Sequence, residues 1–274
     1  MASALAGLLR ENGYRIGEIV SRDNAVSRRR AAALARRTGA SAATWSTARL
    51  DCDILWLAVP DAAIEKLARE LANDMTQRRE LPPVVLHPSG ALSSAALSAL
   101  ARRGVRTASA HPMMTFVAGE PPSLEGAWFA LEGDPAAVRA ARAMARSLGA
   151  RSFLVRQENK TLYHAFGAML SPMLTAELAA AGEVGVKAGI GRRELRRIME
   201  PIVLRTVENL LRRGPDSALS GPLVRGDVAT VAAHLKALGR SPESRVYRAL
   251  TEYAIQKLPG KRKPEMKNLL RGGS

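Results

Sequence analysis

The chain is 274 residues long, with 47% hydrophobic and 24% charged residues. This length and balance suit one large or two modest globular domains and exclude a disordered chain. The formal net charge is +16, but the basic residues are mostly arginines scattered over several predicted helices. Aromatic residues make up only 4%, so base-stacking surfaces are scarce and we expect no specific nucleic-acid partner.

Cysteine usage and hydropathy bear on location. Cys52 is the single cysteine, so no disulfide can form within the chain, and a reducing cytoplasm is the simplest location. The first residues lack the basic segment that opens a signal peptide. The long apolar stretch at 165–186 contains Glu177 and Glu183, which indicates a buried or interface helix rather than a membrane span. We therefore expect a cytoplasmic protein without a membrane partner.

The first half of the chain alternates helical patterns with short apolar runs. We expect helices over residues 2–12, 24–37, 61–72, 93–103 and 135–148, and strands over residues 14–20, 53–59, 84–87, 105–110, 128–131 and 152–155. Strands that alternate in this way with helices predict crossover connections and a mainly parallel sheet.

The second half shows helical patterns only. We expect helices over residues 160–186, 192–211 with a kink at Pro201, 227–238 and 242–256, and a poorly ordered basic tail over 261–274. The predicted fold class is therefore α/β: a Rossmann-like domain over residues 1–157, followed by an all-α domain over residues 158–274.

The start of the chain departs from the usual dinucleotide-binding pattern. Such a fold begins with a strand, a glycine-rich turn and a helix whose N-terminus holds the diphosphate. This sequence opens directly on the helix at residues 2–12, so the first strand and the glycine loop are missing from the pattern. Two explanations stay open. The start site is set roughly ten residues too far downstream, which we favour, or the cofactor site is genuinely lost.

Ligands bind beyond the carboxyl ends of the strands in open α/β sheets, and several candidates lie there. An acidic residue after the second strand would hold the ribose of NAD. Here Ser21 and Arg22 offer a hydroxyl and a guanidinium, which suit the 2′-phosphate of NADP. Each candidate also has an ordinary interpretation as a turn or a helix cap. The cofactor-binding candidates are Ser21, Arg22, Val59, Pro60, Ser89 and Gly90.

Three side chains are candidates for the proton donor of a reduction. His87 and His111 each precede a proline at successive strand ends, and imidazole titrates near neutral pH. Lys160 and His164 are four residues apart and share one helix face. We expect the substrate in a cleft between the domains, although a structural role is the alternative for each residue. The catalytic candidates are Lys160, His111 and His87, and the substrate-binding candidates are Tyr163, His164 and Arg225.

Metal binding is not expected. The four histidines are isolated from one another in the sequence and have no cysteine partners at the spacing of a metal site.

Five motifs occur in order along the chain: AVPD at 58–61, HPSGAL at 87–92, HPMMTF at 111–116, KTLYHA at 160–165 and SGPLVRGD at 220–227. Together they resemble the family of Rossmann-like proteins with a DUF2520 domain, which is similar to pyrroline-5-carboxylate reductase, ketopantoate reductase and the 6-phosphogluconate dehydrogenase group. The resemblance implies a 6-phosphogluconate dehydrogenase C-terminal-like helical domain and a homodimer through it. Pro172 stands where the family pattern predicts asparagine.

The leading hypothesis is an NADP-dependent oxidoreductase, with NAD as the less favoured cofactor. Hydride would pass between the nicotinamide and a small carbonyl or imine substrate in the cleft between the domains. The alternative is a non-catalytic binding or sensor protein on the same scaffold that has lost cofactor binding, because a fold does not by itself imply a function.

Overall fold

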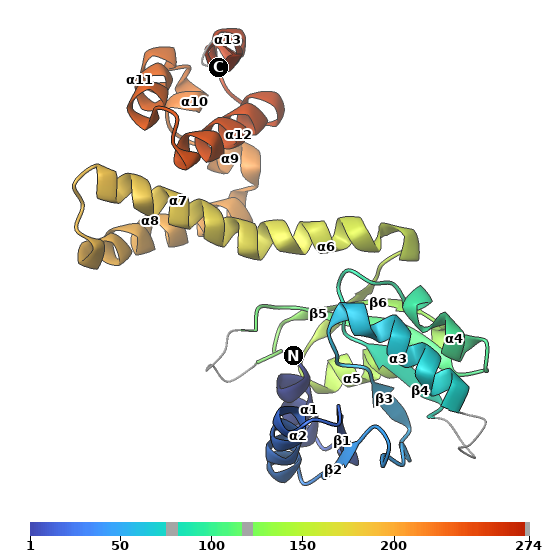
Figure 1. The fold of residues 1–274 in the computed structure, drawn as a ribbon. Coiled ribbons are helices and arrows are strands. Elements are labelled where there is room, and N and C mark those ends of the chain that lie inside the picture. The colour runs from blue at the N-terminus through green and yellow to red at the C-terminus, as the bar shows by residue number, and fades with distance from the viewer. Residues whose placement is uncertain (75–81, 117–122, 272–274) are drawn as a thin grey trace. The chain divides into compact units, whose positions relative to one another are not determined.

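The computed structural model describes residues 1–74, 82–116 and 123–271. The chain forms two compact units, Met1–Met169 and Leu170–Ser274 (Figure 1). The division falls later than the boundary that we expected at residue 157. The division falls later because α6 (Lys160–Ala168) belongs to the first unit. The side chains of Lys160 and Tyr163 form hydrogen bonds with residues of β5.

The first unit alternates strands and helices, and this confirms the expected α/β fold class. A strand at residues 41–44 was not expected, because the sequence Ser-Ala-Ala-Thr contains no apolar run. The elements before α6 are α1 (Ala2–Glu11), β1 (Glu18–Ser21), α2 (Ala25–Thr38), β2 (Ser41–Thr44), β3 (Ile54–Trp56), α3 (Asp61–Asp74), β4 (Val84–His87), the 3-10 helix η1 (Ser94–Leu97), α4 (Ser98–Ala101), β5 (Arg106–Met113), β6 (Trp128–Gly133), α5 (Pro135–Ser147), β7 (Arg151–Leu154) and the 3-10 helix η2 (Gln157–Asn159).

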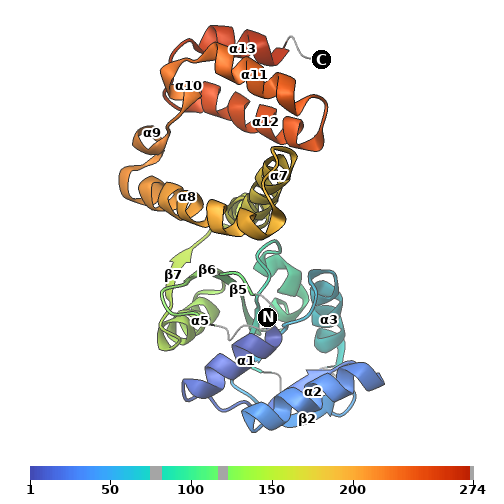
Figure 2. The same cartoon turned by 90° about the vertical axis from the view of Figure 1, so that its left-hand side faces the viewer.

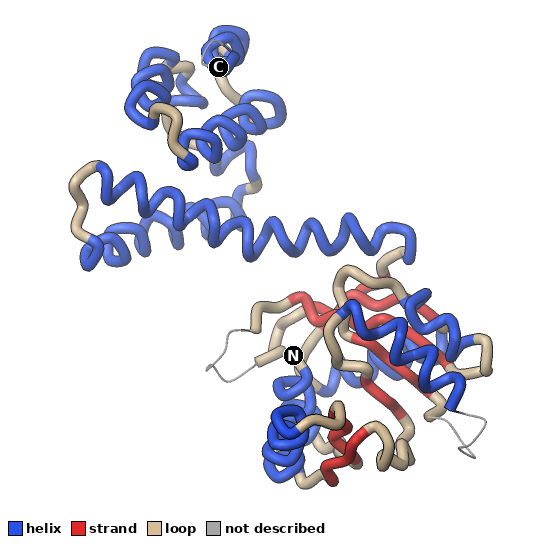
Figure 3. The backbone as a smooth tube through the Cα atoms, viewed as in Figure 1, coloured by secondary structure: helices blue, strands red, loops and turns tan. Residues whose placement is uncertain are grey.

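The strands form two sheets. The larger has the order β3-β4-β5-β6-β7, and the smaller consists of β1 and β2 (Figure 3). Neighbouring strands are parallel except β5 and β6, which pair antiparallel. Among the described residues, β1 and β3 do not pair with each other, yet Val20 of β1 and Leu55 of β3 contribute to one hydrophobic core. The sheet is thus interrupted between β1 and β3, where the sequence pattern lacks a strand.

Helices cover both faces of the larger sheet (Figure 2). α1 and α5 supply the core on one face, and α3, η1 and α4 supply it on the other. Val85 and Leu86 are consecutive residues of β4 and are fully buried in opposite cores, as the pleat of a strand requires. This burial fixes the register of β4 and with it the position of the loop that follows.

Local signals explain where two of these helices begin. The Asn24 side chain accepts from the backbone N–H of Ser27 at 2.9 Å and caps α2. Asp134 accepts from the N–H of Ala136 at 2.8 Å and caps α5, which has Pro135 in its first turn. Such caps satisfy N–H groups that the helix itself leaves free.

Every secondary-structure element in the described part of the second unit is a helix, and loops join these helices, which confirms the expected all-α domain. The helix expected over 160–186 is interrupted by a π-helical turn, η3 (Met169–Met173), which contains Pro172. Proline cannot donate the helical hydrogen bond, and a wider turn accommodates its ring. The helices that follow are α7 (Leu174–Lys187), α8 (Arg192–Arg213, which contains Pro201), α9 (Pro215–Ala218), α10 (Pro222–Arg225), α11 (Val228–Leu238), α12 (Pro242–Lys257) and α13 (Lys263–Arg271).

The prediction of a poorly ordered tail is wrong for residues 263–271. α13 is amphipathic, and Met266 is only 1% exposed in a core with Val231, Leu235 and Ile255. Lys267 and Arg271 are exposed, whereas Lys263 is half-buried. The basic composition of the tail therefore did not reveal the apolar side of this helix. Residues 272–274 lie outside the described part of the chain.

Candidate active site

Candidate residues from three elements gather beyond the carboxyl end of β4 and along β5. β4 ends at His87 and leads into the loop with Ser89 and Gly90, β5 carries Ser109 and His111, and α6 begins at Lys160. All of these lie in the first unit. We call this group the histidine–lysine cluster, and it consists of His87, Ser89, Gly90, Ser109, His111, Lys160, Tyr163 and His164.

Lys160 is the buried cation of the cluster. Its side chain is 2% exposed, and its Nζ donates to Ser109 Oγ at 2.9 Å and to the Ser89 carbonyl at 3.3 Å. Burial lowers the pKa of Lys160 to about 8, against the opposing effect of the carboxylates of Glu132 and Asp61. The ammonium therefore remains mostly protonated at neutral pH, in a place where water does not screen its charge.

His111 is oriented by a tyrosine. Its Nδ1 lies 2.6 Å from the hydroxyl of Tyr163. Burial raises the pKa of Tyr163 to about 12, and burial together with the positive charge of Lys160 lowers the pKa of His111 to about 4. The tyrosine thus stays protonated and donates to a neutral imidazole. We assign the His111 proton to Nε2 on this basis.

Gly90 sits directly against two imidazole rings. A Cβ at this position would lie 2.8 Å from His111 Nε2 and 2.9 Å from His164 Cδ2. Both distances are shorter than van der Waals contact. The glycine therefore lets the loop after β4 approach the two histidines, and any side chain there would displace them.

The structure places His87 in the cluster with both ring nitrogens engaged. The ring is fully buried. Nδ1 accepts from the Ser89 N–H at 3.2 Å, and Nε2 lies 3.2 Å from the Ser93 carbonyl, to which it donates. Burial lowers the pKa of His87 to about 4. A neutral, buried imidazole that bonds both ends of the loop at 87–93 holds the loop in shape.

Sequence reasoning missed three residues of the surrounding hydrogen-bond network, Asp61, Ser109 and Glu132. Ser89 Oγ donates to Asp61 Oδ2 at 2.8 Å, which ties the start of α3 to the loop after β4. The Ser109 hydroxyl donates to the Ser89 carbonyl at 3.1 Å, and Glu132 is buried on β6. Asp61 was named only as the last residue of the AVPD motif and was given no role in the site. Ser109 and Glu132 lie inside strands and carry no local signal.

Val59 and Pro60 lie in the turn between β3 and α3. The Pro60 carbonyl accepts from the Ala63 N–H at 2.8 Å, which is the ordinary geometry of a strand-to-helix turn. The turn lies beside Asp61 and is thereby connected to Ser89.

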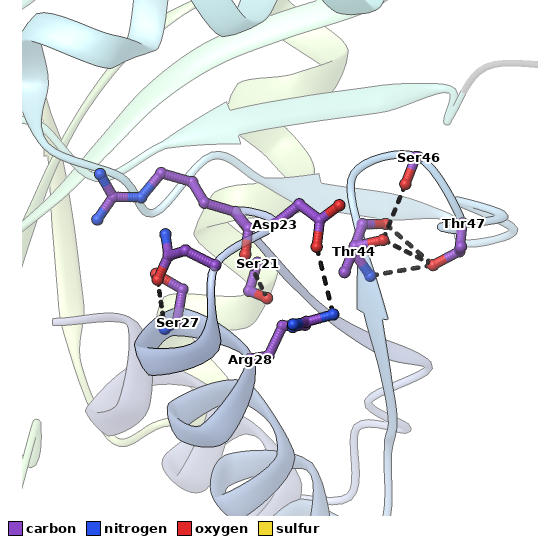
Figure 4. Close-up of polar contacts among 9 residues, drawn as sticks. Ser21, Asp23, Ser27, Arg28, Thr44, Ser46 and Thr47 are labelled. Atoms are coloured by element: carbon purple, nitrogen blue, oxygen red, sulfur yellow. Dashed lines mark hydrogen bonds and ion pairs between the residues drawn. The ribbon is translucent and has the colours of Figure 1, made fainter.

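Hydroxyl and guanidinium groups surround the loops after β1 and β2 (Figure 4). Ser21 Oγ donates to the Arg22 carbonyl at 3.2 Å. Arg28 lies 3.5 Å from Asp23, and both side chains are largely exposed. Thr44 Oγ1 lies 3.0 Å from the hydroxyls of both Ser46 and Thr47; these three were not among the candidates. Such groups suit a phosphate monoester.

Arg225 lies in the second unit, outside the histidine–lysine cluster. Its Nε and Nη2 atoms are each 2.8 Å from Asp227 Oδ2. The side chain is 63% exposed, so its guanidinium is engaged locally by an ion pair at the surface.

A nicotinamide dinucleotide fits these residues only in part. The loop after β1 offers groups for the adenosine phosphate, and the Gly90 loop offers close backbone approach at the other end. In the part of the chain that is described, no strand and helix are joined by the glycine-rich turn that holds the diphosphate. The indole N–H of Trp56, on β3, is buried and has no hydrogen-bond partner among the described residues.

Two further properties concern metals and membranes. Within the described residues, no group of three or more His, Cys, Asp or Glu side chains is arranged to hold a metal ion. None of the helices formed by these residues has the combined length and apolar character that a membrane span needs.

A mainly parallel sheet covered by helices, with polar groups at its strand ends and a helical unit following it in the chain, defines a Rossmann-like α/β protein with a C-terminal helical domain. Residues 1–112 match the Rossmann-like domain family, and residues 127–254 match DUF2520, a domain of unknown function. The chain belongs to the proteins that combine these two domains. No curated protein sequence matches it.

Solved structures share the fold. A protein from Thermotoga maritima is 22% identical with a TM-score of 0.69, covering 98% of this chain and 96% of its own. An imine reductase from Pseudomonas sp. is 21% identical with a TM-score of 0.61, covering 93% and 90%. A reductive aminase from Aspergillus terreus, solved with NADPH and ethyl-5-oxohexanoate, is 17% identical with a TM-score of 0.63, covering 98% and 95%. At these identities the likeness establishes the fold.

Proposed function

We propose that the chain is an NADP-dependent oxidoreductase that reduces a small carbonyl or imine at the histidine–lysine cluster. The observation that carries the proposal is the pairing of an oriented imidazole, His111, with the buried ammonium of Lys160 at the strand ends. Structures of the same fold include an imine reductase and a reductive aminase that was solved with NADPH, which supports this class of reaction. When bound, the nicotinamide would supply the hydride.

The chemistry asked of the protein is polarisation of a double bond. The Nε2–H of His111 donates a hydrogen bond to the carbonyl oxygen or imine nitrogen of the substrate, and Tyr163 holds the ring in the required tautomer. A neutral imidazole is an effective electrophile of this kind. The Lys160 ammonium stabilises negative charge that develops on the substrate, and its burial strengthens this effect.

The catalytic candidates thereby take different parts. His111 is only partly buried and can meet a substrate directly, whereas Lys160 acts through its charge. We propose that His87 shapes the loop, since both of its nitrogens are engaged. Tyr163 and His164 flank the same position.

The preference for NADP over NAD rests on the loop after β1. Ser21 and Arg22 occupy the place where NAD-binding folds carry an acid. Asp23, the nearby carboxylate, is paired with Arg28. This pairing reduces repulsion of a 2′-phosphate, so the loop favours the more negative cofactor.

We further propose that the protein is a homodimer. Neither α7 nor α8 contains a buried residue in the single chain, and many exposed apolar side chains on neighbouring helices are typical of an interface. A second copy is the occupant that presents a complementary apolar surface of its own. The exposed apolar side chains of the second unit are Leu170, Met173, Leu174, Ile198, Ile202, Leu204, Val207, Leu210, Leu211, Leu250 and Tyr253.

The proposed reaction is tested by titrating the purified chain with NADPH and NADH in a calorimeter. We expect NADPH to bind more tightly than NADH and to be consumed in the presence of a cyclic imine. Failure to bind either nucleotide would overturn the proposal, and binding without turnover would favour a sensor.

A matched pair of variants tests the cofactor preference. Arg22→Ala should weaken NADPH binding by about 10-fold or more and leave NADH binding unchanged, because a charge-assisted hydrogen bond contributes about 1.5–3 kcal/mol. Arg30→Ala removes an exposed arginine from α2 and serves as the control. Equal losses in the two variants would mean that general charge, rather than a phosphate contact, governs binding.

A further inference from the structure

The buried Lys160 ammonium has only neutral partners in direct contact, Ser109 Oγ and the Ser89 carbonyl. A buried cation without a counter-charge is strongly disfavoured and tends to lose its proton. The proposed reaction needs the charged form. A carboxylate next to Ser109 and Ser89 would supply the negative counter-charge that the direct contacts of Lys160 lack.

Glu132 occupies that place. It lies on β6 directly opposite Ser109 of β5 in the antiparallel register. Side chains of directly opposite residues share one face of the sheet, with Cβ atoms about 4.5–5.5 Å apart. Since Ser109 accepts from Lys160, the Glu132 side chain leaves the sheet beside the residue that the ammonium contacts, and the Glu132 charge acts on Lys160.

The Glu132 carboxylate is fixed as well as buried. The side chain is 6% exposed. One of its oxygens accepts from the Ser94 N–H at 2.7 Å, and the other accepts from Ser94 Oγ at 2.7 Å. The two bonds to Ser94 hold the carboxyl group of Glu132 at the start of η1, at a set position beside the cluster.

The other ionisable groups around Lys160 differ from Glu132. Asp61 also faces Lys160, through Ser89, but it is exposed to solvent. None of the other titratable neighbours of Lys160 is a carboxylate. They are His87 at the end of β4, His111 on β5, and Tyr163 and His164 on α6. Among these neighbours Glu132 is therefore the buried, fixed carboxylate.

We propose that Glu132 is a positioning residue that keeps the Lys160 side chain protonated and directed at Ser109 and Ser89. This inference rests on the proposed function for the use made of that charge, but the coupling between the two side chains stands independently. Glu132 acts through Lys160 and does not touch the substrate.

The primary test follows the titration of Lys160 by NMR in protein labelled at the lysine side chains, with the signal assigned from Lys160→Arg. In Glu132→Gln, which keeps an oxygen for the Ser94 N–H, the titration of Lys160 should move to lower pH by about one unit. Glu132→Asp should restore much of the shift. Glu125→Gln, an exposed glutamate just before β6, is the control. An unchanged Lys160 titration in Glu132→Gln would overturn the proposal.

Activity gives a second and separable readout. If charged Lys160 supports the reaction, the rate falls as pH rises through its pKa of about 8. Glu132→Gln should move this alkaline limb to lower pH, so that the variant is impaired at pH 8 and recovers at lower pH. An NMR shift without a shift of the limb would contradict the role given to Lys160 in the reaction and leave the coupling intact.

Folding failure of Glu132→Gln does not end the test. The double variant Glu132→Gln/Lys160→Met removes both charges. Recovery of a folded protein in the double variant would show that the carboxylate is needed because the ammonium is present. If the double variant is also unfolded, Glu132 is needed only to stabilise η1 through Ser94, and the proposal is overturned.

Discussion

At the scale of single residues, Gly90 shows how little room the cluster leaves. Its Cα faces the rings of His111 and His164, and a Cβ would lie 2.8 Å from one and 2.9 Å from the other. The backbone there has no positive φ, so the constraint is space and not conformation. This explains a glycine after β4 without invoking a turn type.

Gly90→Ala should therefore displace His111 from its hydrogen bond with Tyr163. We expect a loss of about 1–3 kcal/mol in unfolding free energy, as for other overpacked sites, together with a marked fall in kcat/KM. Urea denaturation and steady-state kinetics measure the two effects. Gly7→Ala is the control, because nothing lies within 4 Å of its added Cβ in α1, and alanine is the better helix former. Wild-type stability and activity in Gly90→Ala would contradict this account.

At the scale of elements, α13 shows that a basic segment can be a packed part of a domain. Lys267 and Arg271 are exposed, while Met266 of the same helix is almost fully buried. Arg248 of α12 also donates to the Leu270 carbonyl at 3.1 Å, which fastens the end of the helix.

Met266→Ala should destabilise the second unit by about 2–5 kcal/mol, because it leaves a cavity in a small core. Met114→Ala, at a methionine that is 43% exposed, should change stability far less. Thermal unfolding followed by circular dichroism compares the two. Equal midpoints for both variants would show that α13 contributes no packing energy.

At the scale of the whole molecule, the exposed apolar side chains of α7 and α8 predict self-association. Light scattering should give a mass near twice the 29.3 kDa of one chain. Ile202→Glu places a charge at a side chain that is 66% exposed and should yield monomers. Arg197→Glu alters the charge of the same helix without removing apolar surface and should leave the dimer intact. A wild-type protein that is monomeric at high concentration would refute the prediction.

Much of the fold was accessible to sequence reasoning because its signals are local. The alternation of strands and helices up to residue 157 and the helical second half depend on patterns among neighbouring residues. The break at Pro172 and the helix at 263–271 were missed, since the first depends on how the helix accommodates a proline and the second on a core formed by other helices.

The order of the amino acids is enough to place His87, Ser89, Gly90 and His111 at strand ends and Lys160 at the start of a helix. The use made of these residues depends on contacts that form in the folded chain. Lys160 donates to Ser109, which is 51 residues away in the sequence. Both ring nitrogens of His87 form hydrogen bonds with residues of its own loop. Glu132 lies opposite Ser109 because of the register of two antiparallel strands. Contacts of this kind depend on strand pairing between distant segments, and no local pattern in the chain encodes that pairing.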